Sequence, residues 1–348
     1  MTLSYLPVFL SPLLLVAYCL FVGYACLALL NTQRTTLKNI LLAPAAGLSV
    51  IIVTVFTLSW FGLPVKSFGF TLFVSLFCIS AVALFYKKPL FPYKRYFLFF
   101  SLLLLALCIT GRPFLQFGLG WYGYLNDDML NYCLGANYFL EHGYFGPLNT
   151  NLIVQGKHYE NFYWFEFVPG AFRSGSELLV AWISAVSGLK PLQVFMPTML
   201  GLHLMIIQSI AGLTYTTRKN WRVPFLSSLL YTTAAMASLG IYYQLIAQAD
   251  GLILFIACVA FLLRASLPHY KHGKWRYGIL CALLASAFAI LYPELFSLFI
   301  LSLFTYYGVL FLRFRTVDLK IFSLIAIITI GCALFLHGYL FNFFSIIF

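Results

Sequence analysis

The chain has 348 residues, of which 62% are hydrophobic and 9% are charged, whereas a soluble domain carries about 25% charged residues. This composition excludes a water-soluble globular fold, because too few polar side chains are present to cover a surface. The net charge of +12 would suggest nucleic-acid binding in a soluble protein. Here Lys and Arg lie in short turns between apolar runs, so we predict no nucleic-acid partner.

Ten apolar runs divide the sequence, and a helix needs about 20 mostly apolar residues to cross the bilayer. Helices are the simplest way to satisfy the backbone in lipid. We therefore predict an all-α, polytopic transmembrane helix bundle of about ten spans. The runs cover residues 4–30, 39–62, 67–86, 96–113, 191–216, 223–243, 251–266, 276–292, 295–313 and 319–340.

Basic residues are concentrated in every second turn between these runs, which the positive-inside rule assigns to the cytoplasm. With this orientation, eight of the nine acidic residues lie outside or at the outer ends of spans, and only Asp318 lies inside. We predict an integral membrane protein of the bacterial inner (plasma) membrane. The five basic turns contain Arg34 and Lys38; Lys87, Lys88, Lys94 and Arg95; Arg218, Lys219 and Arg222; Lys271, Lys274 and Arg276; and Arg313, Arg315 and Lys320.

Six of the eight outer acids lie in one segment, residues 114–190, which we predict to be a long extracytoplasmic loop that contains short helices. Helical spacing of apolar residues, followed by Gly143 as a C-terminal cap, predicts a helix over 128–141. The run from Ser176 to Leu189 is too short for a span and fits a helix that lies along the outer membrane interface. Long loops in compact proteins are usually functional, so we expect the site here.

Asp127 and Asp128 are adjacent carboxylates at the start of the first of these helices. Such a pair can accept a proton from an attacking hydroxyl, or supply oxygen ligands to Mg²⁺ or Mn²⁺. The alternative is that they only cap the helix and complement its dipole. No metal is firmly assigned, and both interpretations stay open.

A second group of candidate residues follows in the same loop. Aromatic faces suit sugar rings, and Arg or Lys suits a phosphate at the membrane surface. The aromatics are equally explained as an interfacial belt, and Arg112 and Lys190 as side chains that snorkel at helix ends. The candidates are Lys157, His158, Tyr159, Glu160, Trp164 and Arg173, with Arg112 from the preceding run.

Five further polar residues lie within or beside the later apolar runs. Asp250 and Glu294 fall at outer helix ends, where we interpret them as ordinary loop acids or as groups facing an aqueous cavity. For His203, Gln208 and Tyr292 we predict packing or interhelical hydrogen bonds.

From about residue 96 onward the order of parts resembles the GT-C superfamily of polyprenyl-phosphate-sugar-dependent glycosyltransferases. The resemblance rests on a span ending in Gly111-Arg112-Pro113, the outer loop with Asp127-Asp128, the helix from Ser176, and a span closing in the basic turn Thr217-Arg218-Lys219. Three spans precede this unit where one is usual, so we divide the chain into 1–95 and 96–348. No outer domain follows the last run, which fits either a compact or a truncated form.

The resemblance implies transfer of a sugar, a hexose or a pentose, from a lipid-linked donor to a glycan, lipid or protein acceptor on the outer side. Asp127 or Asp128 would be the general base, with a divalent cation as an optional cofactor. Arg173, with Lys157 or Arg112, would hold the donor phosphate, and His158, Tyr159, Glu160 and Trp164 would contact sugar or acceptor. Two alternatives stay open: a polytopic transporter or lipid flippase, and a noncatalytic assembly subunit.

Overall fold

The computed structural model describes residues 6–30, 37–123, 128–146, 151, 155, 174–217, 220–266, 274–314, 319–337 and 339. Across these residues the fold is all-helical, as predicted. The helices are α1 (Leu6–Leu30), α2 (Leu37–Trp60), α3 (Val65–Lys87), α4 (Tyr93–Ile109), α5 (Arg112–Phe117), the short 3₁₀ helix η2 (Gly118–Gly120), α6 (Asp128–Glu141), α9 (Ser174–Ser187), α10 (Pro191–Thr217), α11 (Arg222–Thr233), α12 (Ala235–Tyr242), α13 (Ile246–Ser266), α14 (Lys274–Leu291), α15 (Pro293–Phe314) and α16 (Leu319–Leu336).

Each of the ten apolar runs falls on a helix or on a pair of helices. Within the described segments, five helices (α1, α2, α3, α10 and α13) are long and apolar enough to cross a membrane. The count is seven if α4 with α5, and α11 with α12, each form one bent span. The apolar stretches of α14, α15 and α16 are shorter. The chain therefore has several membrane-spanning helices, five to seven by length and composition.

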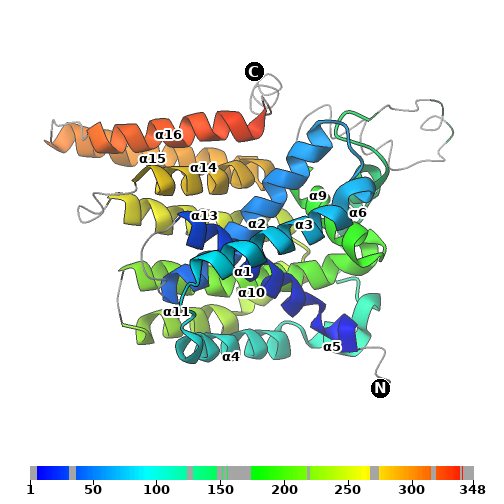
Figure 1. Ribbon diagram of the computed structural model, residues 1–348. Helices are drawn as coiled ribbons and strands as arrows, with labels where there is room; N and C mark the ends of the chain where they lie inside the picture. The colour runs from blue at the N-terminus through cyan, green and yellow to red at the C-terminus, as the bar shows by residue number, and fades with distance from the viewer. Residues whose placement is uncertain are drawn as a thin grey trace.

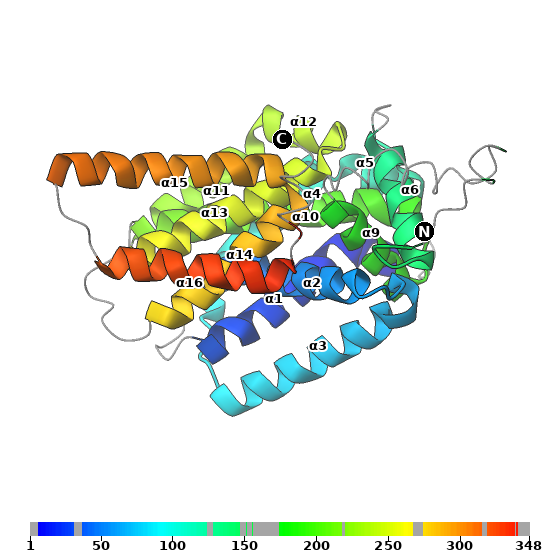
Figure 2. The same ribbon diagram turned by 90° about the horizontal axis from the view of Figure 1, so that it is seen from above.

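The helices lie side by side in one bundle, and its two ends differ in chemistry (Figures 1 and 2). At one end α3, α10, α13 and α15 finish and α4, α11, α14 and α16 begin. Basic residues occupy these helix ends, for example Lys87, Arg264 and Arg313 in last turns. The short helices α5, α6 and α9 lie at the opposite end. The concentration of basic residues at the first of these ends agrees with the predicted charge pattern, although Lys66 pairs with Glu141 of α6 at the other end.

The centre of the bundle is formed by α2 and α10. In the apolar window of α10, 94% of the residues are buried, against 28% in that of α3. The outward side of α3 carries large apolar side chains such as Phe77, Val82 and Phe85, and α15 does the same with Leu301 and Phe304. Such surfaces are suited to lipid rather than water. Helix α2 packs against α10, α13 and α14, so the predicted units 1–95 and 96–348 share one core, and their division stays a prediction.

The crossing of α1 and α2 depends on two glycines. A Cβ on Gly23 would overlap the carbonyl oxygen of Ala43, and a Cβ on Gly47 would overlap that of Cys19. The two backbones therefore touch directly. Small residues at such crossings let helices approach closely in lipid, where packing rather than the hydrophobic effect drives association.

One buried cation ties three helices together at the basic end of the bundle. The Arg264 guanidinium, 2% exposed, donates to Asn39 Oδ1 on α2 at 2.7 Å and to the Tyr277 hydroxyl on α14 at 3.2 Å. Hydrogen bonds from a charged donor contribute about 1.5–3 kcal/mol each. Arg264 thus fixes α13 against both neighbours.

Candidate functional site

Most residues of the predicted site lie outside the described part of the chain. This holds for Asp127 and for the whole loop group, and their roles stay predictions. The residues concerned are Asp127, Lys157, His158, Tyr159, Glu160, Trp164 and Arg173.

Asp128 and Arg112 are described. Asp128 is the first residue of α6, half-buried, and α6 ends at Glu141 as predicted. The position places a carboxylate at the positive end of the helix dipole. Arg112 begins α5 and is exposed. Within the described segments the two form no ion pair with each other.

Helix α9 confirms the predicted short helix but has a different setting from the one expected. Its residues from Ser174 to Trp182 are all buried, and it packs against α2, α3, α6, α10 and α14. The Trp182 indole N–H donates to the Gly69 carbonyl of α3 at 3.2 Å. A helix on the membrane interface would leave its apolar side facing lipid. The first nine residues of α9 instead insert into the protein, where neighbouring helices enclose them, and the helix reaches the surface at Ser187.

The buried start of α9 brings acidic residues together. The Ser176 hydroxyl donates to Asp250 Oδ2 on α13 at 3.1 Å. Asp250 is 0% exposed and Glu177 only 2%, and the two carboxyl groups interact electrostatically. Burying an ionised carboxylate without a compensating positive charge or hydrogen bond is costly. The burial of two interacting acids at this position therefore requires an explanation.

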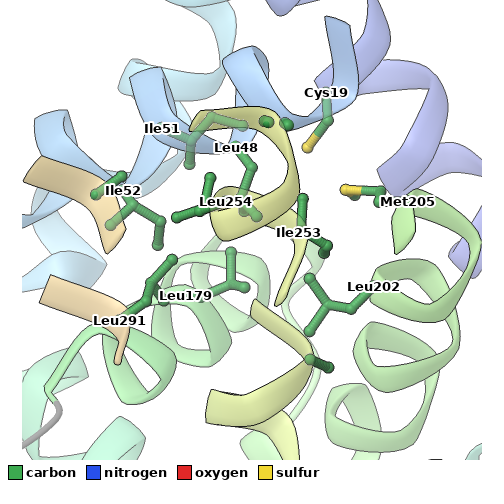
Figure 3. Packing of buried hydrophobic residues seen from close by; sticks show 14 of the residues in the cluster. Cys19, Leu48, Ile51, Ile52, Leu179, Leu202, Met205, Ile253, Leu254 and Leu291 are labelled. Carbon is green, nitrogen blue, oxygen red and sulfur yellow. The ribbon is translucent and has the colours of Figure 1, made fainter. Parts of the chain in front are cut away.

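Helix ends supply part of that explanation. Gly175, the second residue of α9, lies against the last residues of α14: a Cβ there would lie 2.8 Å from the Leu291 Cα. Helix α13 meets the turn between α14 and α15, since a Cβ on Gly251 would lie 2.7 Å from the Tyr292 ring. The beginnings of α9, α13 and α15 therefore converge. The start of a helix carries a partial positive charge that favours an acid in the first turn, as Glu177 has in α9 and Glu294 in α15. Asp250 lies just beyond the first turn of α13. Figure 3 shows the adjoining apolar layer, to which α2, α9, α13 and α14 contribute.

Two tyrosines and a serine border the same acids. Ser174 Oγ lies 3.4 Å from the Tyr144 hydroxyl and also hydrogen-bonds Tyr339. Burial raises the pKa of both phenols above its usual range, and the negative charge of Glu177 raises each further. Both tyrosines are therefore neutral at physiological pH and can donate hydrogen bonds. We define Tyr144, Ser174, Ser176, Glu177, Asp250, Glu294 and Tyr339 as the acidic cluster.

A second buried polar group lies where two helices are broken. The α4–α5 pair bends by 67° and the α11–α12 pair by 53°. Thr110, at the first break, lies 2.7 Å from Ser238 of α12 (Oγ1 to Oγ) and 3.4 Å from His203 Nε2 of α10. Gln208 lies 3.4 Å from the Tyr96 hydroxyl. The predicted interhelical hydrogen bonding of His203 and Gln208 is confirmed.

The acidic cluster was only partly visible in the sequence. Asp250 and Glu294 are recognisable as acids at outer helix ends, but interpretation as ordinary loop acids is wrong for Asp250, which is enclosed. Glu177, Ser174 and Ser176 carry no motif, and their meeting depends on α9 inserting into the bundle. Within the described residues, no three His, Cys, Asp or Glu side chains gather closely enough to hold a metal ion.

The long apolar helices and their lipid-suited surfaces define an integral, multi-pass helical membrane protein. Comparison of the chain with protein-family models, curated protein sequences and solved structures finds no match. The assignment beyond this class therefore rests on the chain's own residues.

Proposed function

We propose that this protein is a membrane glycosyltransferase that moves a sugar from a polyprenyl-phosphate carrier to an acceptor hydroxyl on the outer side of the membrane. One observation carries the proposal: α6 begins with Asp128 at the end of the bundle opposite the basic helix ends. The proposed reaction requires a general base on the outer side of the membrane, and in the proposed topology this end of the bundle faces outward. The packing of α6 against α9 gives this carboxylate a rigid support.

The proposal includes the full topology. Helices α14, α15 and α16 cross the membrane together with the seven spans counted above, which makes ten. The basic helix ends face the cytoplasm, and α5, α6 and α9 face outward. The membrane is the bacterial inner membrane, where lipid-linked sugars are presented on the outer leaflet.

The proposed reaction is a displacement at the anomeric carbon. The acceptor oxygen forms a bond to that carbon while its proton passes to Asp127 or Asp128. The bond from the anomeric carbon to the phosphate oxygen breaks, and the lipid phosphate leaves with the electron pair. Arg173, with Lys157 or Arg112, binds that phosphate and stabilises its growing negative charge. The loop residues His158, Tyr159, Glu160 and Trp164 contact the sugar or acceptor.

One specific observation favours a second candidate, a transporter or lipid flippase. Such proteins form their binding sites from discontinuous helices, and the two broken pairs α4–α5 and α11–α12 meet at Thr110 and Ser238. Against it, the acids lie at helix beginnings at one end of the bundle.

Reconstitution separates the two candidates. The purified protein is placed in liposomes that contain a radiolabelled polyprenyl-phosphate sugar, and extracts of envelope glycans and lipids are added as acceptors. We expect label to move into a water-soluble or a new lipid product. Movement of intact labelled lipid between leaflets, without any product, would instead support the flippase.

Arg173→Ala is expected to raise the donor KM at least about 10-fold, since a charge-assisted bond to phosphate contributes about 1.5–3 kcal/mol. The acceptor KM should change little. Separate saturation curves for donor and acceptor measure this, with Arg222→Ala, which changes an exposed arginine at the start of α11, as the matched control. An unchanged donor KM would remove the phosphate role from Arg173.

A further inference from the structure

Asp250 is fully enclosed, and half of its carboxyl group is unsatisfied. Oδ2 accepts the hydrogen bond of Ser176, but Oδ1 has no hydrogen-bond donor within the described part of the chain. Because Ser176 directly precedes Glu177, the Asp250 carboxyl points from α13 toward the acidic start of α9. This unsatisfied atom is an observation separate from the grouping of acids.

The surroundings of Asp250 supply little positive charge. The titratable groups that interact with it are Cys19 of α1 and Glu177 of α9. Beyond Glu177, the acidic cluster adds Glu294 and the two phenols. No Lys, Arg or His of the described segments forms an ion pair with Asp250. The same helices contribute apolar side chains to the core, among them Leu179 of α9, Leu254 of α13 and Leu291 of α14 (Figure 3).

Helix dipoles offset only part of a buried carboxylate's charge, because each end carries about half an elementary charge. Two carboxyl groups that interact at this depth resist simultaneous ionisation. A unit positive charge bound beside Asp250 removes the conflict. It also gives Asp250 Oδ1 a partner, and hydroxyl and carboxylate oxygens are ligands that a small hard cation accepts.

We propose that Asp250, Glu177 and Ser176 form a buried site that binds one positive charge, either a proton or a monovalent alkali cation, where α9 meets α13. The site goes beyond the proposed transfer reaction and does not depend on it. Its occupant holds the start of α9 against α13. The stability of the fold is therefore linked to the concentration of that occupant.

Thermal unfolding of the full-length protein in detergent tests the site. The unfolding midpoint is measured at about pH 5 and about pH 8 in N-methylglucamine chloride, and again at about pH 8 with sodium or potassium chloride at equal ionic strength. Asp250→Asn, Glu177→Gln and Ser176→Ala are compared with the natural chain. Glu141→Gln is the matched control, because Glu141 is an exposed acid paired with Lys66 at 3.0 Å.

Two results support the site, and they identify its occupant. For an alkali cation, sodium or potassium raises the midpoint by about 3 °C or more, and the rise disappears in Asp250→Asn. For a proton, the midpoint falls between about pH 5 and about pH 8 without any cation effect, since charging a buried carboxyl opposes folding, and Asp250→Asn removes that fall. Glu141→Gln should behave as the natural chain in both.

The proposal is overturned if Asp250→Asn responds to pH and to cations as the natural chain does, or if the natural chain responds to neither. Should Asp250→Asn fail to fold, Glu177→Gln and Ser176→Ala decide by the same criteria. Removal of either group should at least halve the response.

Discussion

Replacing both Asp127 and Asp128 by Asn is expected to lower the rate of sugar transfer by about 10²–10⁴-fold, the usual contribution of a general base. Asn keeps the size and the capping ability of Asp, so α6 should still form. The loss should therefore fall on turnover, while expression and membrane insertion persist. Transfer from a labelled lipid-linked donor measures the effect, with the two single substitutions showing which carboxylate takes the proton.

Glu141→Gln is the control for this experiment. It also removes a carboxylate from α6, but at the exposed end of the helix, where Glu141 pairs with Lys66. Its turnover should stay within about 2-fold of the natural chain, because exposed ion pairs contribute about 1 kcal/mol or less. Full activity in the double Asn variant would show that the pair only caps α6 and would remove the catalytic role.

Gly47→Ala is expected to prevent α1 and α2 from packing. The added Cβ would overlap the backbone carbonyl of Cys19, and backbone cannot rotate away as a side chain can. Overpacking in a close-packed core costs about 1–3 kcal/mol and more where backbone must move. We expect a lower unfolding midpoint, or aggregation, in size-exclusion chromatography and thermal unfolding in detergent.

Gly308→Ala provides the matched comparison. Gly308 also lies within a long helix, α15, but a Cβ there meets nothing within 4 Å. Alanine is the better helix former by about 0.5–1 kcal/mol, so this variant should be as stable as the natural chain or slightly more so. Equal stability of both alanine variants would contradict the direct α1–α2 contact.

The helices were predictable because their signals are local. Long apolar runs predicted α1, α2, α3 and α10. The helical spacing of apolar residues after Asp128, with Gly143 as a C-terminal cap, predicted the bounds of α6. The number of membrane-spanning helices was harder to predict from the sequence. Helices α14 and α16 have 18 residues each, and basic residues in the first turn of each shorten the apolar stretch. Apolar stretches of that length lie at the limit for crossing a bilayer.

Two acids of the acidic cluster were recognisable in the sequence, but the meeting of its residues was not predictable, because it depends on tertiary packing. The periodicity of α9 shows a short apolar helix, and nothing in it distinguishes burial in protein from contact with lipid. Ser176 and Asp250 are 74 residues apart, and no spacing rule relates them. The candidate site around Asp127 was predictable only as a motif in a loop, and its geometry beyond Asp128 stays a prediction.

Arg264 has a consequence for how the protein is made. Its partner Asn39 is synthesised 225 residues earlier, so α2 enters the bilayer long before its polar group can bond. A buried amide in lipid without a partner is costly, so water or lipid headgroups must supply hydrogen bonds to Asn39 during translation. The α2–α13–α14 junction thus closes late in biogenesis, and nascent chains released before Tyr277 has been inserted should be preferred substrates of membrane quality-control proteases.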